Sequence, residues 1–262
     1  MEIFENQINA VKFRSTNYIW NQLKLNSPWS IGYVSTLIEA RDFMTKEEWK
    51  KHYYRSGEER LRKIDELCTP EQKEALLDFT KATPSLPKEL KELNFSYGRT
   101  EEELEERGKY MYEKIVEQGN KQKVTLAECV YSVKFRVMAE TWNGIVARER
   151  NTIKTIGQFF PTFSFKKTEG ERDYQYGIDY ELFEEDELVC AVQIKPMSYK
   201  KGFSKEIIKA KKANEAKNQK YKEEYQADVL YVYSNSKGVI TNDDVFAEIK
   251  QRAMLKSAFV QQ

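Results

Sequence analysis

Two short segments decide the fold of this chain: YGIDYEL (residues 176–182) and VCAVQIKP (residues 189–196), joined by a short acidic turn. Both are rich in the β-branched and aromatic residues that strands prefer. The first segment carries Asp179, and the second carries Gln193 and Lys195. Because side chains alternate between the two faces of a strand, Gln193 and Lys195 share a face opposite to that of their apolar neighbours. The two segments therefore predict a β-hairpin that gathers polar groups on one side.

The turn between the two strands constrains how they pair. Asp179 lies opposite Gln193 only if the loop has an odd number of residues or if a bulge interrupts the ladder. A three-residue loop from Glu185 to Glu187 meets this condition, and it is the loop we predict.

The residues around the hairpin predict the rest of a mixed sheet. Residues typical of strands fall in four runs, 159–165, 177–183, 188–195 and 228–234. A polar helical stretch, residues 204–225, separates the last two runs, so these two strands should be parallel and joined by a right-handed crossover. Residues 242–256 predict a closing helix.

Residues 1 to about 150 are predicted to be mainly helical, because helix-start signals recur there. In each signal a Ser or Thr side chain accepts from a first-turn amide, and a Glu or Gln three residues later reaches back. The pairs are Thr45 with Glu48, Ser56 with Glu59, Thr69 with Gln72, Thr100 with Glu103, and Thr125 with Glu128. Pro70 follows at a first helical position, where its missing amide costs nothing. Residues 83–98 form the main irregular stretch that we predict.

Composition narrows the chemistry that the chain can perform. The 43 basic and 42 acidic side chains nearly cancel, so net charge does not by itself indicate a nucleic-acid partner. The three cysteines are far apart and are expected to be reduced core residues. His52 is the single histidine, which argues against zinc sites built on several imidazoles and against Ser-His-Asp triads. Catalysis must therefore depend on carboxylates, lysines or tyrosines. With no apolar run long enough to span a membrane and no signal peptide, we expect a cytoplasmic protein without a membrane partner.

The Gly-Ile-Asp and Val-Gln-Ile-Lys segments and the order of elements resemble the PD-(D/E)xK nuclease superfamily over about residues 125–235. The core of that superfamily is a helix, a three-stranded meander, a crossover helix and a further strand. The resemblance predicts an α/β (α+β) fold, with a mainly helical region at residues 1–124 for DNA recognition or dimerisation and a nuclease core at residues 125–262. The same segments also resemble restriction endonucleases, in particular the MjaI-like branch.

The resemblance implies an activity and its partners. It implies a type II restriction endonuclease that hydrolyses phosphodiester bonds of double-stranded DNA at a short palindromic sequence. Mg²⁺ is the implied cofactor, with Mn²⁺ as a substitute. The expected assembly is a homodimer, and a separate DNA methyltransferase would protect the host sites.

The resemblance also assigns roles to individual residues. Asp179 matches the metal-binding aspartate, Gln193 the acidic position of the second half-motif, and Lys195 the lysine. The implied metal ligands are Asp179, Gln193 and Ile194, and Glu140 on the preceding helix is the candidate that completes the catalytic set. Gln193 departs from the usual Asp or Glu, which weakens the case for two metals. Since Mg²⁺ needs only one or two carboxylates, we expect one firmly bound ion.

Several assignments remain open at this point. A protonated Lys195 would stabilise developing negative charge, whereas a deprotonated Lys195 would act as a base. Glu140 fits an ordinary boundary glutamate equally well. Asp173 and Glu181 are rival carboxylates, of which Asp173 precedes the strand and Glu181 shares a face with Asp179.

Contacts to DNA are predicted less specifically than the hairpin site. The candidates are Lys200, Lys201, Asn143 and Arg148, and a run of lysines continues from Lys205 to Lys222. Such residues neutralise phosphates, although a run of charges is more often a solvated helix face. The tryptophans are expected in the core or at an interface. Two other functions remain open, a repair nuclease or junction resolvase, and a non-catalytic DNA-binding protein with the same core.

Overall fold

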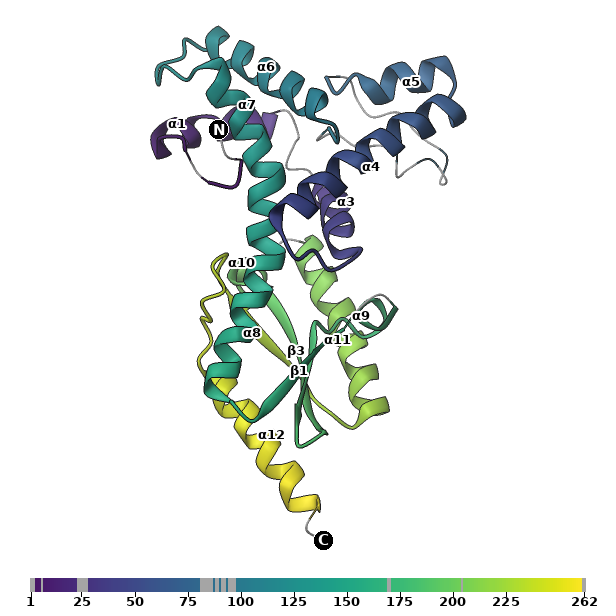
Figure 1. Ribbon diagram of the computed structural model, residues 1–262, viewed down its shortest axis with the longest axis vertical. Coiled ribbons are helices and arrows are strands. Elements are labelled where there is room, and N and C mark those ends of the chain that lie inside the picture. The colour runs from purple at the N-terminus through teal and green to yellow at the C-terminus, as the bar shows by residue number, and fades with distance from the viewer. Residues whose placement is uncertain are drawn as a thin grey trace. The chain divides into compact units, whose positions relative to one another are not determined.

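The computed structural model describes residues 3–5, 7–22, 28–80, 87, 90, 93, 98–168, 171–203 and 205–260. The chain divides into two compact units, Met1–Trp142 and Asn143–Gln262 (Figure 1). The predicted functional division after residue 124 remains a prediction. Across the described ranges, every helix is too short or too polar to cross a membrane.

The first unit consists of helices. They are α1 (Ala10–Ser15), α2 (Asn17–Gln22), α3 (Pro28–Glu39), α4 (Lys46–Leu67), α5 (Pro70–Leu77), α6 (Glu101–Glu117), α7 (Leu126–Lys134) and the π-helical segment η2 (Phe135–Glu140). Four of the predicted capping boxes are confirmed, at Thr45, Thr69, Thr100 and Thr125. Most of the predicted irregular stretch, residues 83–98, lies outside the described residues.

The predicted helix start at Ser56 is wrong. Ser56 lies inside α4, where its hydroxyl donates to the carbonyl of Tyr53 at 2.6 Å. The buried face of α4 runs without interruption from Trp49 to Ile64. Packing of this face therefore outweighs the local capping signal, and the serine bonds back to the preceding turn instead.

Helices α6 and α7 pack closely where Gly108 meets Val130. A Cβ at Gly108 would lie 2.4 Å from the Cα of Val130, so only glycine allows this approach. Trp20, Trp49 and Trp142 are buried, as predicted for core residues, whereas the side chain of Trp29 lies outside the described residues.

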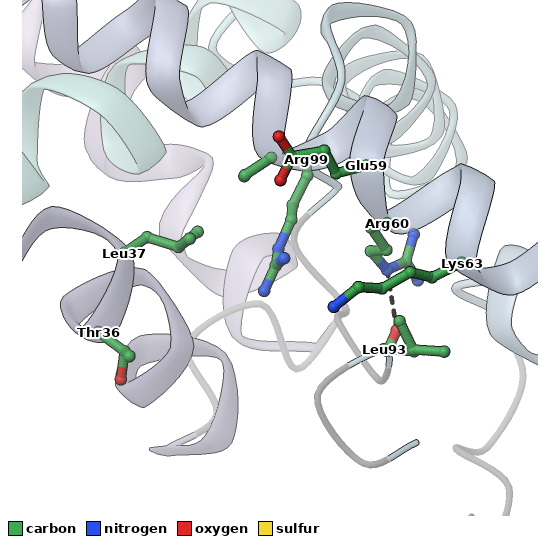
Figure 2. A pocket seen from close by; sticks show the side chains of 8 residues that line it. Thr36, Leu37, Glu59, Arg60, Lys63, Leu93 and Arg99 are labelled. Atoms are coloured by element: carbon green, nitrogen blue, oxygen red, sulfur yellow. Dashed lines mark hydrogen bonds between the residues drawn. The ribbon is translucent and has the colours of Figure 1, made fainter. Parts of the chain in front are cut away.

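A buried ion pair joins α4 to α6. The Arg60 side chain is fully buried and donates to Glu103 at 3.1 Å and to the carbonyl of Leu93 at 2.8 Å. Beside it is a pocket of about 310 Å³ lined by Thr36, Leu37, Ser56, Glu59, Arg60, Lys63, Leu93 and Arg99 (Figure 2). This pocket belongs to the helical unit and contains none of the hairpin residues.

The second unit is a four-stranded mixed sheet between helices. Its elements are η3 (Asn143–Ala147), α8 (Arg148–Phe159), β1 (Phe163–Lys167), α9 (Glu171–Tyr176), β2 (Tyr180–Glu184), β3 (Glu187–Pro196), α10 (Met197–Lys201), α11 (Lys205–Tyr225), β4 (Val229–Ser234) and α12 (Asp244–Val260). The strand order is β1-β2-β3-β4, with β1, β2 and β3 antiparallel and β3 parallel to β4. The predicted mixed sheet and the parallel pairing of the last two strands are confirmed.

The predicted start of the first strand is wrong. Phe159 ends helix α8 instead of starting a strand, because its ring packs on Phe246 of α12 at 4.2 Å between centroids. The short helix α9 was not predicted, and it fills part of the connection between β1 and β2.

Helices cover both faces of the sheet in this unit (Figure 1). One face packs on α8 and α12, with a core of Ile156, Tyr180, Leu182, Val189, Cys190, Val192, Ile194, Leu230, Val232, Ile240, Val245 and Ile249. The other face meets α9 and α11 through Tyr176, Ile178, Ala191, Tyr221 and Ala227. Cys190 is buried and free, as predicted for a reduced core cysteine.

The hairpin turn differs from the predicted three-residue loop. Glu184 pairs with Glu187, so the turn consists of Glu185 and Asp186, both with positive φ, as type I′ turns require. The register then shifts by one residue after Leu182, where a bulge places Val189 in the β3 ladder as the extra residue. The bulge therefore supplies the odd residue that the loop does not.

Candidate active site

Asp179 immediately precedes β2 and forms backbone hydrogen bonds to the segments on both sides of it. Its amide donates to the carbonyl of Val192 at 2.9 Å, and its own carbonyl accepts from Thr168 at 3.0 Å. Its carboxylate Oδ2 accepts from the amide of Ile194 at 2.5 Å. The backbone and the side chain of Asp179 are thus both held against β3.

Gln193 and Lys195 both belong to β3, and their side chains lie on the same face of the sheet as each other. Tyr180 pairs with Val192 at the end of the β2–β3 ladder, and Asp179, just before it, bonds to β3 through the Val192 carbonyl and the Ile194 amide, which flank Gln193. On the other side, Gln193 pairs with Tyr231 of β4, and Lys195 pairs with Tyr233. Because side chains alternate along a strand, Gln193 and Lys195 project from the face covered by α11.

Burial and the neighbouring cations shift the pKa of Asp179 in opposite directions. Burial raises the pKa of Asp179, while Lys195, the Ile194 amide, Lys167 and Arg148 lower it in that order of strength, and the net shift is upward. Three cationic side chains therefore surround one half-buried carboxylate. Such a cationic surrounding suits an anionic substrate such as a phosphodiester.

The Gln193 amide is the least satisfied group of the site. The residue is 2% exposed, and its Oε1 finds no hydrogen-bond partner among the described residues. Its Nε2 lies 3.3 Å from the position that a Cβ on Gly177 would occupy, and Asn214 Oδ1 lies 3.5 Å from the same point. A buried polar atom without a partner requires an explanation, and a ligand absent from the chain itself is one.

The oxygen atoms near Asp179 fit a hard divalent cation. No three His, Cys, Asp or Glu side chains of the described residues form a metal-binding group, so an ion here would rest on Asp179 and neutral oxygens. Gln193 Oε1 is one of these. The carbonyl of Ile194 is another, because it points to the same edge of β3 as the amide that Asp179 accepts from. Mg²⁺ accepts such a set, since it keeps several waters and needs only one or two carboxylates.

The rival carboxylates have other positions. Glu181 is 1% exposed, pairs with Arg172 and accepts from the hydroxyl of Tyr221 at 2.7 Å, so its oxygens are already engaged. Asp173 lies in α9, and its side chain is outside the described residues. Glu140 belongs to the first unit, where it ends η2 with an exposed side chain.

The residues predicted to contact DNA lie on two short segments of the second unit. Asn143 begins η3, and Arg148 begins α8 close enough to Asp179 to lower its pKa. The buried Arg148 Nε has no hydrogen-bond partner within the described ranges. Lys200 and Lys201 are exposed on α10, directly after the strand that carries Lys195.

Residue-by-residue reading of the sequence missed two groups at this site. Lys167 ends β1 and is paired with Tyr180, next to Asp179. Asn214 lies on the crossover helix α11, and its Oδ1 lies 3.5 Å from the position that a Cβ on Gly177 would occupy. No sequence motif predicts either residue. The position of Lys167 depends on the β1–β2 register, and that of Asn214 depends on which side of α11 faces the sheet.

Comparison with known proteins identifies the family. The chain matches the family model described as MjaI restriction endonuclease over residues 16–251, which spans most of both units. Nothing matched among curated proteins or among solved structures. The chain therefore belongs to the MjaI restriction endonuclease family, whose members are hydrolases that cut DNA.

Proposed function

We propose that Asp179, Gln193 and Lys195 form a Mg²⁺-dependent site that cuts both strands of a short, palindromic DNA sequence. Restriction endonucleases generally use divalent metal ions, and membership of this family implies that the substrate is DNA. The observation that carries the proposal is Gln193 Oε1, a buried oxygen with no hydrogen-bond partner in the described part of the chain, one residue before Ile194, whose amide donates to the Asp179 carboxylate at 2.5 Å. A metal ion bound at this position would be coordinated by this oxygen and so would supply its missing partner.

Each group of the site has a role in this proposal. Asp179, Gln193 Oε1 and the carbonyl of Ile194 would hold Mg²⁺, which on binding lowers the pKa of a coordinated water and neutralises phosphate charge. The Ile194 amide orients the Asp179 carboxylate through its hydrogen bond. Lys195 extends from the same face and stabilises the negative charge that develops on the phosphate oxygens. Glu140 remains the candidate for a further carboxylate.

The DNA-binding surface of the proposal surrounds this site. Arg148, with a buried Nε that nothing in the described ranges accepts from, and Asn143 contact the backbone near the cut. Lys200 and Lys201 add phosphate contacts from α10. The helical region, residues 1–124, supplies base recognition and the subunit interface.

The test is cleavage of a plasmid of known sequence by the purified protein with Mg²⁺. We expect discrete bands. Asp179→Asn and Lys195→Ala should abolish cleavage while leaving the circular dichroism spectrum unchanged. Asp179→Asn should also bind duplex more tightly, because it removes a negative charge near phosphate.

Two matched controls show whether these losses are specific. Asp186→Asn makes the same change at the other end of the hairpin, and Lys250→Ala removes an exposed lysine of α12. Both should cut like wild type. Nicking of branched DNA in place of discrete bands would favour a junction resolvase, and wild-type activity in Asp179→Asn would refute the site.

A further inference from the structure

The loop between α10 and α11 carries a highly exposed aromatic residue, Phe203. Its side chain is 85% exposed, more than any other large apolar side chain among the described residues. A single exposed apolar side chain is common on protein surfaces and by itself indicates no function. Phe203 differs from such a residue in its charged neighbours and in the way its loop is held.

Lysines lie on both sides of Phe203 along the chain. Lys200 and Lys201 end α10, Lys205 begins α11, and all of them are exposed. No acidic residue occurs between Lys200 and Lys205 in the sequence. The ring therefore belongs to a positively charged segment, which attracts a polyanion such as DNA and disfavours contact with a second copy of itself.

The loop that carries Phe203 is held in place by Lys211 of α11. The ammonium of Lys211 donates to the carbonyl of Lys200 at 3.1 Å and to the carbonyl of Gly202, directly before Phe203, at 3.3 Å. Gly202 lets the loop pack closely, because a Cβ there would lie 2.8 Å from the carbonyl oxygen of Ser198. A loop that is already held loses less conformational entropy when its exposed ring binds a partner.

Helix α10 connects this loop to the candidate active site. It follows directly after β3, the strand that carries Lys195. Lys195 pairs with Tyr233 in the sheet, and the ammonium of Lys200 lies 5.2 Å from the centroid of the Tyr233 ring. The lysines before Phe203 therefore lie next to the strand position that pairs with Lys195. DNA, the substrate of the family, is the partner that fits both the charge and this location.

We propose that Phe203 inserts its ring between bases of the bound duplex, while the flanking lysines contact phosphates. Phenylalanine is among the apolar residues that proteins insert between base steps, where the ring takes the place of part of the lost base stacking. Such stacking tolerates any sequence, because every base has a flat face. The inference rests on the proposed contact of α10 with DNA, but it does not depend on the metal site.

The experiment measures binding of a fluorescently labelled duplex to the full-length protein by anisotropy, with EDTA present so that no strand is cut. Loss of an aromatic side chain that stacks on a base lowers affinity by about 10-fold, and we expect this loss in Phe203→Ala. The variant removes no charge, so the slope of log affinity against log salt concentration should equal that of wild type. Lys201→Ala should instead reduce this slope by about 1.

Two results with Phe203→Ala would overturn the inference. An unchanged affinity would show that the ring does not contact DNA. A loss of affinity with a reduced salt slope would show that the lysines of the loop have moved, so that the ring has only a structural role.

Phe203→Trp reports on the insertion itself. The larger ring should keep the affinity of wild type, and an indole that stacks on a base loses fluorescence. We expect duplex to quench the emission that this variant adds to that of wild type, and to protect it from quenching by acrylamide. Emission that is the same with and without duplex would contradict insertion.

Met254 provides the matched control, because it is an apolar side chain, 59% exposed, at the other end of the sheet (Figure 1). It lies on α12 near Arg252, which donates to Asp228 at 3.1 Å, just before the start of β4. Helix α10 follows the end of β3, which is parallel to β4. Met254→Ala should bind duplex like wild type, and duplex should not quench the emission of Met254→Trp.

The measurements also separate this inference from a subunit contact and from the proposed function. If Phe203 belonged to a subunit interface, Phe203→Ala would lower the mass of the protein in solution without DNA, and the inference would be wrong. A wild type that cuts DNA with Mg²⁺, together with unchanged duplex binding in Phe203→Ala, would overturn the inference and leave the function standing. A wild type that shows the expected effects of Phe203 on binding but never cuts DNA would overturn the function alone.

Discussion

Gln193 places a neutral oxygen at the position where the resemblance to PD-(D/E)xK nucleases implies an acidic residue, and its burial decides how a substitution acts. Since Oε1 has no hydrogen-bond partner in the described residues, Gln193→Glu breaks no hydrogen bond of that oxygen. We expect the variant to fold and to cut DNA. The added charge should shift its metal preference toward Mn²⁺. The ratio of cleavage rates in Mn²⁺ and Mg²⁺ measures the shift, and a ratio equal to that of wild type would count against a metal at this position.

Gly177 lies close to Gln193, and the space beside it is too small for a larger side chain. Its φ of +64° is left-handed, and a Cβ there would press on Gln193 Nε2 at 3.3 Å. Gly177→Ala should cost about 1–2 kcal/mol of unfolding free energy for the backbone alone. It should also slow cleavage, because Gln193 must move. Urea unfolding and plasmid cleavage measure the two effects.

Gly119→Ala separates the two effects in the Gly177 prediction. Gly119 also has a left-handed backbone, with φ +86°, but nothing lies within 4 Å of its Cβ position. This variant should lose similar stability and keep wild-type cleavage. If Gly177→Ala behaves in the same way, the close approach of Gln193 to residue 177 has no part in catalysis.

The residues of the site could be predicted from the sequence to different depths. Asp179 and Lys195 stand out because charged groups are unusual in strands that are otherwise apolar. Asn214 could not be predicted, because nothing local to α11 shows which of its polar residues faces the sheet. Glu181 was predicted to share a face with Asp179, yet its partners Arg172 and Tyr221 come from two helices whose positions no motif reveals.

The register of the β2–β3 hairpin could be predicted from the sequence only in part. The condition that an odd loop or a bulge must align Asp179 with Gln193 follows from the alternation of side chains. Both solutions satisfy it, and the chain adopts the bulge at Val189 with a two-residue turn. Without the bulge the same turn would set Asp179 opposite Val192. The choice between the two depends on packing of Val189 and Cys190 against the same core, which is a tertiary effect.

The ion pair between α4 and α6 predicts how acid affects the helical unit. Burial alone would raise the pKa of Glu103, but Arg60, Arg107 and the amides of Arg99 and Thr100 outweigh it, so the folded pKa is lowered. A lowered folded pKa adds stability that is complete above the unfolded pKa and is lost as pH falls through the folded value. Glu103 therefore stabilises the fold at neutral pH and ceases to do so in acid.

Glu103→Gln tests this contribution because glutamine keeps the capping box but not the charge. It leaves the buried Arg60 without its counter-ion and should cost about 3 kcal/mol at neutral pH. Urea unfolding as a function of pH should show the difference from wild type shrinking in acid. The exposed pair Arg62–Glu66 is the control, where Glu66→Gln should cost at most about 1 kcal/mol. A difference for Glu103→Gln that stays constant with pH would contradict the assignment.

If the hairpin of Asp179 and Lys195 is the active site, one site in each chain must account for cuts in two strands of DNA. No second Asp…Gln-x-Lys pattern is visible in the chain, so the two cuts require two subunits or two successive visits. A two-fold dimer presents identical sites to the antiparallel strands, and its symmetry matches a palindromic sequence. Large aromatic side chains are enriched in protein interfaces, and the helical region is rich in tyrosine. Tyr53 is fully buried and donates to the carbonyl of Gly98, so it packs within the subunit. Tyr54, Tyr110 and Tyr112 are partly exposed, and we propose them as candidates for the subunit interface.

The proposal of a two-fold dimer can be tested by mixing active and inactive subunits. Wild type should have the mass of two chains in solution on its DNA, and it should linearise plasmid without accumulating nicked circles. Co-expression of wild type with Asp179→Asn under separate affinity tags yields mixed dimers, in which one site cuts and the other cannot. Purified through both tags, these dimers should produce nicked circles as their main product, because each encounter breaks one strand. A chain that stays monomeric on DNA, or mixed dimers that linearise plasmid as fast as wild type, would show that each cut is made independently.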